Sequence, residues 1–160
     1  MRPLPSERLN QKIKAVWRIN SLIATFCWTG FLICPIIVLI VLTEISRIWL
    51  VIPIALFLVW RVPAFFVFPR IRYARWRYEI LHDEVDILEG LFFVTRTIIP
   101  MIRVQYTDTS QGPIMRAFKL SSVAIVTAGG TVKIPGLTPQ DADALRDKIA
   151  ALAKIAKEDV

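Results

Sequence analysis

SLIATFCWTGFLICPIIVLIVL, residues 21–42, is an uncharged apolar run that decides the architecture of this chain. As a helix with a rise of about 1.5 Å per residue, this run is long enough to cross a hydrocarbon core of about 30 Å. A second apolar run of similar length covers residues 48–68, and residues 43–47 between them leave room only for a tight reversal. Neither run has the polar stripe of a soluble amphipathic helix. The sequence therefore predicts a two-helix transmembrane hairpin.

Basic residues flank both apolar runs, whereas the short reversal holds one acidic and one basic residue, Glu44 and Arg47. By the positive-inside rule, this asymmetry predicts a multi-pass protein of the cell membrane with both termini in the cytoplasm. The formal net charge of +7 is therefore attributed to the membrane flanks rather than to a nucleic-acid surface. We expect contact with membrane lipids, and the predicted headgroup contacts are Lys12, Lys14, Arg18, Arg70, Arg72, Arg75 and Arg77.

The chain divides into four predicted segments. Residues 1–20 form a basic cytoplasmic N-terminal arm, residues 21–68 the hairpin with spans at 21–42 and 48–68, and residues 69–77 a basic juxtamembrane connector. Residues 78–160 remain for one small cytoplasmic domain. In the connector, Tyr73 and Trp76 are expected to anchor at the membrane interface, where aromatic residues are enriched.

The pattern after the connector changes to short alternating runs of apolar and polar residues, which predict half-buried β-strands. Turn residues mark their limits: His82 to Glu84, Glu89 with Gly90, and Gly129 with Gly130. Pro113 is expected to start a single helical turn. The predicted strands are residues 76–81, 85–88, 91–98, 103–107, 122–127 and 132–135.

A C-terminal helix is predicted after these strands. Thr138 is placed to cap its N-terminus, with Pro139 in the first helical position. Spacings of three and four then form one apolar stripe, which we expect to close the open end of a β-sandwich or barrel. The stripe consists of Ala142, Leu145, Ile149, Leu152 and Ala156.

The order and spacing of many short motifs from about residue 72 onward resemble the YdbS-like bacterial pleckstrin-homology (PH) domain. They include Trp76-Arg77-Tyr78, Asp83-Glu84, Glu89-Gly90-Leu91, Thr97-Ile98-Ile99-Pro100, Arg103-Val104-Gln105, Gln111-Gly112-Pro113-Ile114, Thr127-Ala128-Gly129-Gly130 and Ile134-Pro135-Gly136-Leu137. The resemblance implies a PH-like fold, a bent antiparallel sandwich closed by a C-terminal α-helix, behind a two-helix membrane hairpin. It also implies seven strands where the pattern predicts six, and a glycine where Lys119 stands.

The predicted domain offers little for catalysis. Its histidine, His82, lies in a turn beside Asp83 and Glu84, where solvated surface residues are the better interpretation. Asp83, Glu84, Asp86 and Glu89 lack the spacing of a calcium loop, and the domain has no cysteine. We therefore expect a non-enzymatic protein without a cofactor or a metal. The acidic turn at residues 82–84 also stands where related eukaryotic domains carry basic phosphoinositide-binding residues, so that headgroup recognition by that route is not expected.

A protein-contact surface is the best candidate site. Arg103 and Gln105 are expected to alternate outward from Val104 and Tyr106 if their strand is regular. The full candidate surface is Arg103, Gln105, Asp108, Gln111 and Arg116. The alternative is that Asp108 and Arg116 pair and only hold the connection between strands in place.

Arg61 is a charge inside the second apolar run, which makes it a functional hypothesis. It can snorkel or pack against the other helix, or it can line an oligomeric pathway. Three functions follow. The first is a membrane-anchored PH-like module for assembly with itself or with a related PH-domain membrane protein, to which the resemblance adds envelope maintenance or stress resistance. The second is a component of a transport or export path that uses Arg61, and the third is an anionic-lipid sensor.

Overall fold

The computed structural model describes residues 3–42 and 48–158. Two compact units divide the chain, Trp17–Arg70 and the combination of Met1–Val16 with Ile71–Val160, and each is described by itself. The elements in chain order are α1 (Ile13–Leu42), α2 (Ile48–Phe66), α3 (Phe68–Arg75), β1 (Arg77–Ile80), β2 (Glu84–Gly90), β3 (Val94–Pro100), η1 (Met101–Arg103), β4 (Val104–Ser110), α4 (Pro113–Ala117), β5 (Ser121–Thr127), β6 (Gly130–Leu137) and α5 (Pro139–Glu158).

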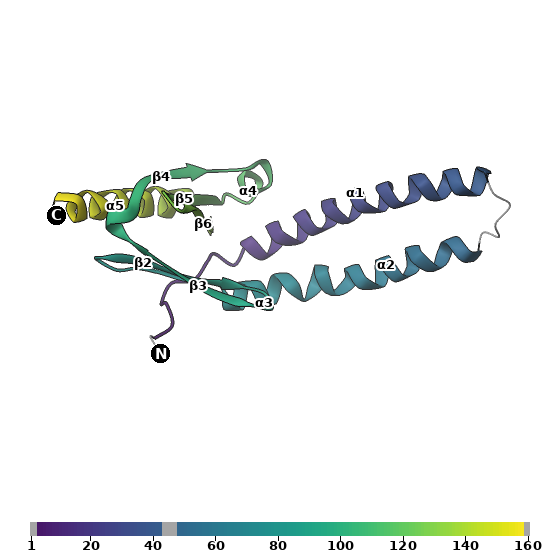
Figure 1. Ribbon diagram of the computed structural model, residues 1–160, viewed down its shortest axis with the longest axis horizontal. Helices are drawn as coiled ribbons and strands as arrows, with labels where there is room; N and C mark the ends of the chain where they lie inside the picture. Colours follow the sequence, from purple (N-terminus) through teal and green to yellow (C-terminus); the bar gives the residue numbers. More distant parts are fainter. Residues whose placement is uncertain (1–2, 43–47, 159–160) are drawn as a thin grey trace. The chain divides into compact units, whose positions relative to one another are not determined.

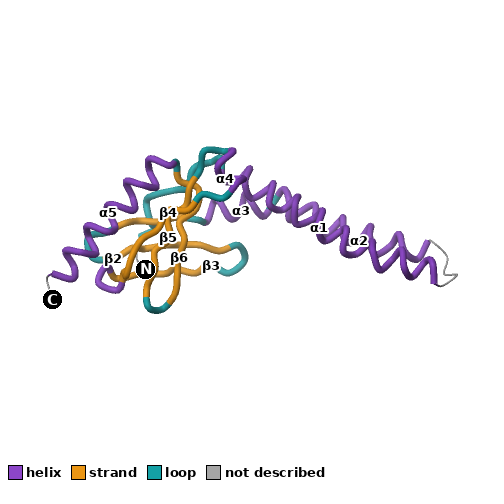
Figure 2. The backbone as a smooth tube through the Cα atoms, turned by 90° about the horizontal axis from the view of Figure 1, so that it is seen from above, coloured by secondary structure: helices purple, strands orange, loops and turns teal. Residues whose placement is uncertain are grey.

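The unit Trp17–Arg70 consists of the long apolar helices, and α1 and α2 lie side by side in it (Figure 2). Among the described residues, one segment, Ile13–Pro35, is long and apolar enough to cross a membrane. The predicted reversal at residues 43–47 lies outside the described residues. One membrane-crossing helix is thus supported, and the second span of the predicted hairpin stays a prediction.

The other unit is built on two antiparallel sheets of three strands each, in the orders β1-β2-β3 and β4-β5-β6 (Figure 1). The six strands predicted from the pattern are all present, with shifted limits. β3 begins at Val94 rather than at Leu91, because residues 91–93 form the reversal after β2. The turn predicted at Glu89 and Gly90 was therefore placed too early, since Gly90 still pairs with Val94.

Gly90 explains why the chain reverses at this point. Its φ is +144°, and a Cβ added there would lie 1.9 Å from the carbonyl oxygen of Phe93. Only glycine permits so close an approach of the two backbone segments. The apolar run from Leu91 to Val94, which favoured a continuous strand in the sequence, is consequently displayed around a tight reversal.

Helix α5 closes the domain as predicted. Thr138 Oγ1 accepts a hydrogen bond from the Asp141 backbone N–H at 3.1 Å, which confirms the N-cap. Ala142 and Ile149 of the apolar stripe are buried, and α5 packs against η1 and the sheet β4-β5-β6. The helical turn at Pro113 is also confirmed, as α4.

The N-terminal segment belongs to the domain rather than to a separate arm. Glu7 and Tyr78 exchange backbone hydrogen bonds, from Glu7 N to Tyr78 O at 3.0 Å and from Tyr78 N to Glu7 O at 3.1 Å. Leu9, Ile13 and Val16 are then fully buried. The compact unit accordingly joins residues from both sides of the apolar helices, and it differs from the predicted domain, which began at residue 78.

Gly136 makes a close contact with this N-terminal segment. Its carbonyl accepts a hydrogen bond from Asn10 N at 2.9 Å. Its φ is +70°, and an added Cβ would lie 2.8 Å from Ile13 Cβ, so a side chain at this position would displace Ile13. Ile13 is completely buried, and the other completely buried side chains of the domain come from both sheets, η1 and α5, among them Ile87, Met101, Ile125, Ile134 and Ile149.

Trp76 does not anchor at the membrane interface. The predicted connector is helical as α3 up to Arg75, and Trp76 then turns into the core, where it is 1% exposed. Its indole N–H donates to Glu89 Oε2 at 3.3 Å, and its ring packs edge-on against Tyr78. Trp76 therefore packs in the core although it lies between two arginines, because it directly precedes strand β1 of the domain.

Candidate interaction surface

A groove of about 660 Å³ opens where the end of β3 and the start of β4 approach the β5–β6 turn. Ile98 and Ile102 are partly exposed, so that the groove presents apolar side chains to solvent. Arg103 and Lys157 add positive charge to its lining. The groove is lined by residues 97–100, 102–105 and 127–132 together with Lys157.

Two strand edges border this groove. In the part of the chain that the structure describes, β3 pairs with β2 alone and β4 pairs with β5 alone. Each strand therefore leaves one row of backbone N–H and C=O groups without a strand partner. An extended peptide can add to such an edge by main-chain hydrogen bonds while its side chains enter the adjoining hollow.

Of the five residues of the predicted contact surface, only two line the groove. Arg103 and Gln105 are exposed and line the groove. Asp108 and Arg116 are exposed beyond it, and no hydrogen bond or ion pair joins them among the described residues. Gln111 faces the protein instead, because its Nε2 donates to Leu120 O at 2.8 Å and closes the loop that carries α4.

Tyr106 is exposed, contrary to the prediction that it alternates inward with Val104. A β-bulge between Val104 and Tyr106 shifts the register of β4 against β5, and the Tyr106 side chain is 57% exposed as a result. It lines a second hollow of about 480 Å³ between β4 and α5, which shares Gln105 and Lys157 with the groove. Alternating hydrophobicity cannot reveal a bulge, and the sequence reasoning therefore missed Tyr106 as a surface residue.

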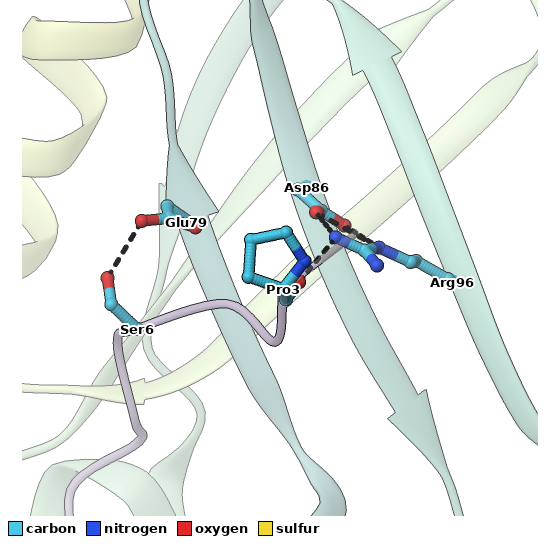
Figure 3. Close-up of polar contacts among 5 residues, drawn as sticks. All are labelled: Pro3, Ser6, Glu79, Asp86 and Arg96. Atoms are coloured by element: carbon cyan, nitrogen blue, oxygen red, sulfur yellow. Dashed lines mark hydrogen bonds and ion pairs between the residues drawn. The ribbon is translucent and has the colours of Figure 1, made fainter. Parts of the chain in front are cut away.

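Asp86 forms a buried ion pair that the sequence did not predict (Figure 3). Its side chain is 2% exposed, and Arg96 Nε lies 3.0 Å from both carboxylate oxygens. This hydrogen bond raises the pKa of Arg96 above its ordinary value. Arg96 Nη2 also donates to Pro3 O at 2.9 Å, so the pair ties the N-terminal segment to the sheet β1-β2-β3. Asp86 and Arg96 thus join β2, β3 and the N-terminal segment.

Tyr78 marks the other contact of the N-terminal segment. Burial, with the nearby charges of Glu7 and Asp141, raises the pKa of Tyr78 to about 12. The phenol is therefore neutral throughout the physiological range. Its side chain is part of the buried core.

The predicted headgroup residues differ in their surroundings. Lys14 Nζ lies 4.5 Å from the centre of the Tyr73 ring, in a cation–π contact. Arg75 Nη1 donates to Leu91 O at 2.6 Å and so holds the β2–β3 reversal. The others are exposed or half-buried, namely Lys12, Arg18, Arg70, Arg72 and Arg77.

Arg61 is engaged within the helical unit. Its Nε donates to Thr25 Oγ1 at 2.9 Å, and its Nη2 donates to Ser21 O at 3.2 Å. Both acceptors belong to α1, and the guanidinium also lies 5.9 Å from the centre of the Phe57 ring. A charge inside an apolar helix thereby gains polar partners, which agrees with the helix-packing interpretation.

His82 is a solvated turn residue, as predicted. Its side chain is exposed, and Nδ1 lies 2.8 Å from Asp83 Oδ1 in the reversal between β1 and β2. Across residues 3–42 and 48–158, no three side chains of His, Cys, Asp or Glu come together in a way that could hold a metal ion. Nothing in this turn provides a buried base or a nucleophile for catalysis.

A family model for the bacterial PH domain matches residues 21–153. This chain belongs to the bacterial PH-domain family. The UPF0699 transmembrane protein YdbS of Bacillus subtilis (strain 168) is 44% identical to it over 106 residues, which are 66% of this chain and 67% of that protein. The UPF0699 transmembrane protein YdbT of the same organism is 42% identical over 60 residues, which are 38% of this chain and 12% of the longer relative.

These relatives confirm the YdbS-like resemblance found in the sequence and identify a membrane-associated bacterial PH domain. No solved structure matches the chain. The two sheets and the closing helix α5 are the PH-like part of the fold, and the apolar helix α1 supports its association with the membrane.

Proposed function

We propose that this bacterial PH domain is a non-enzymatic, membrane-anchored module for protein–protein assembly at the cytoplasmic face of the cell membrane. Its partner is a second copy or a related PH-domain membrane protein, and the process it serves is envelope maintenance or stress resistance. The observation that carries the proposal is the partly apolar groove beside the two free strand edges of β3 and β4. A surface of this kind suits an extended peptide from a protein partner.

The proposal includes two membrane spans, with α2 crossing the bilayer beside α1 and both termini in the cytoplasm. Two observations support it: the basic residues at both flanks, and the hydrogen bonds from Arg61 to α1. Because these bonds use the Arg61 guanidinium between the two helices, they favour a packing role over a place in a transport path.

Site-specific photo-crosslinking tests the assembly function. Arg103 is replaced by p-benzoylphenylalanine in the full chain expressed in its native membrane, and the crosslinked products are identified by mass spectrometry. We expect one defined protein product, either this chain or another PH-domain membrane protein. The matched control carries the same amino acid at Ala144, which is exposed on α5 and does not line the groove. Equal products from both positions, or none from Arg103, would refute the groove as the contact surface.

A further inference from the structure

The β2–β3 reversal displays two adjacent phenylalanine side chains to solvent. Phe92 is 71% exposed and Phe93 is 89% exposed, and Val94 beside them is half exposed. Exposed side chains of this size are costly in water, because each leaves apolar surface unburied. Clustered at one tip, they indicate a surface that functions in contact with something apolar.

Three contacts fix the conformation of the β2–β3 reversal. Gly90 brings the Phe93 carbonyl against the end of β2. Arg75 Nη1 donates to Leu91 O at 2.6 Å, and Trp76 Nε1 donates to Glu89 Oε2 at 3.3 Å. The hairpin tip therefore lies beside the end of α3 (Figure 1), and the two phenylalanines project from a fixed base.

The same domain is joined to the membrane helix by a short length of chain. Val16 is buried in the domain core, and α1 continues from it without a break into the uncharged residues 21–42. Five residues of helix rise about 7.5 Å, which is comparable to the polar headgroup layer on one side of a bilayer. The chain thus tethers the domain within a few residues of the apolar run.

Positive charge accompanies the aromatic tip. Arg75 contacts Leu91 directly, and Arg72 is exposed one helical turn earlier on α3. Aromatic residues are enriched at membrane interfaces, and basic residues next to them favour anionic lipids. Apolar side chains at a tip with flanking arginines match the chemistry of a bilayer surface better than that of a soluble protein partner.

We propose that the hairpin tip, residues 91–94, inserts into the interfacial layer of the membrane that α1 enters. The ligand is the bilayer surface itself, with the phenylalanines among the upper acyl chains and the arginines at anionic headgroups. Insertion gives the tethered domain a second point of attachment and fixes its orientation on the membrane. The inference does not depend on the assembly function, which uses the groove at the end of β3 and the start of β4.

Collision accessibility of a spin label tests the insertion. Cys27 and Cys34, which form no disulfide, are first replaced by serine. A nitroxide is then attached through Phe93→Cys in the full chain, reconstituted in nanodiscs of phosphatidylcholine and phosphatidylglycerol. The control label is attached through Ala144→Cys, at a position that is exposed on α5 and does not line the groove.

We expect oxygen to collide with the label at position 93 more often than a water-soluble nickel complex does, and the opposite at position 144. Adding Phe92→Ser should move the position-93 label toward water. Equal water exposure at both positions would overturn the proposal. Low collision rates with both reagents at position 93 would also overturn it, since they would show that a protein surface covers the tip.

Discussion

Ile13→Ala is expected to destabilise the whole domain, although Ile13 lies before the membrane helix and most of the domain lies after it. The side chain is completely buried, and it packs on Gly136. The change removes three carbon atoms, worth about 0.8 kcal/mol each in lost burial, and leaves a cavity that adds to the loss. We expect a decrease of about 3 kcal/mol in the free energy of unfolding.

Pulse proteolysis of the full chain in nanodiscs, over a series of urea concentrations, measures this decrease. With a slope of about 1–3 kcal/mol per molar urea, the midpoint should fall by roughly 1–3 M. Leu4→Ala is the matched control, because Leu4 lies in the same segment but is exposed, and its effect should stay within about 0.5 kcal/mol. An Ile13→Ala midpoint equal to that of Leu4→Ala would refute the inclusion of the N-terminal segment in the core.

Three further predictions concern substitutions of single residues. Lys119 has a φ of +53°, so Lys119→Gly should raise the unfolding free energy by about 0.5–1 kcal/mol, whereas Lys119→Ala should bring no gain. Thr138→Ala removes the cap of α5 and should cost about 1 kcal/mol in the same urea assay, with no loss in Thr95→Ala. Tyr78 has a raised pKa of about 12, so its contribution to stability is complete below pH of about 10 and is lost as the pH rises to 12; Tyr78→Phe should escape that loss.

Much of the fold could be predicted from the sequence because its signals are local. Alternating apolar residues identified the six strands, and Thr138 with Pro139 identified the start of α5. The glycine that the family places before Leu120 corresponds to the positive φ of Lys119. Each of these features depends on neighbouring residues, which a pattern can express.

Long-range contacts could not be predicted in this way. The pairing of Glu7 with Tyr78 and the hydrogen bond from Arg96 to Pro3 join residues far apart in the chain, and no local pattern records them. In the sequence, Trp76 beside arginines has the pattern of an interfacial anchor. Its burial depends on contacts with the domain that follows, which the local pattern does not contain.

The candidate site was predicted in part for a related reason. Arg103 and Gln105 do line the groove, although Arg103 ends η1 and only Gln105 belongs to β4. The bulge that exposes Tyr106 and the hydrogen bond that turns Gln111 toward Leu120 depend on the register of β4 against β5, which the sequence does not state.

The mass of the complex that this chain forms in its native membrane tests the central claim most directly. After mild crosslinking and extraction into nanodiscs, native mass spectrometry measures that mass and identifies any protein that accompanies the chain. The assembly function predicts a defined complex, either an oligomer of this chain or a pairing with a related PH-domain membrane protein. A monomer without a companion would contradict it.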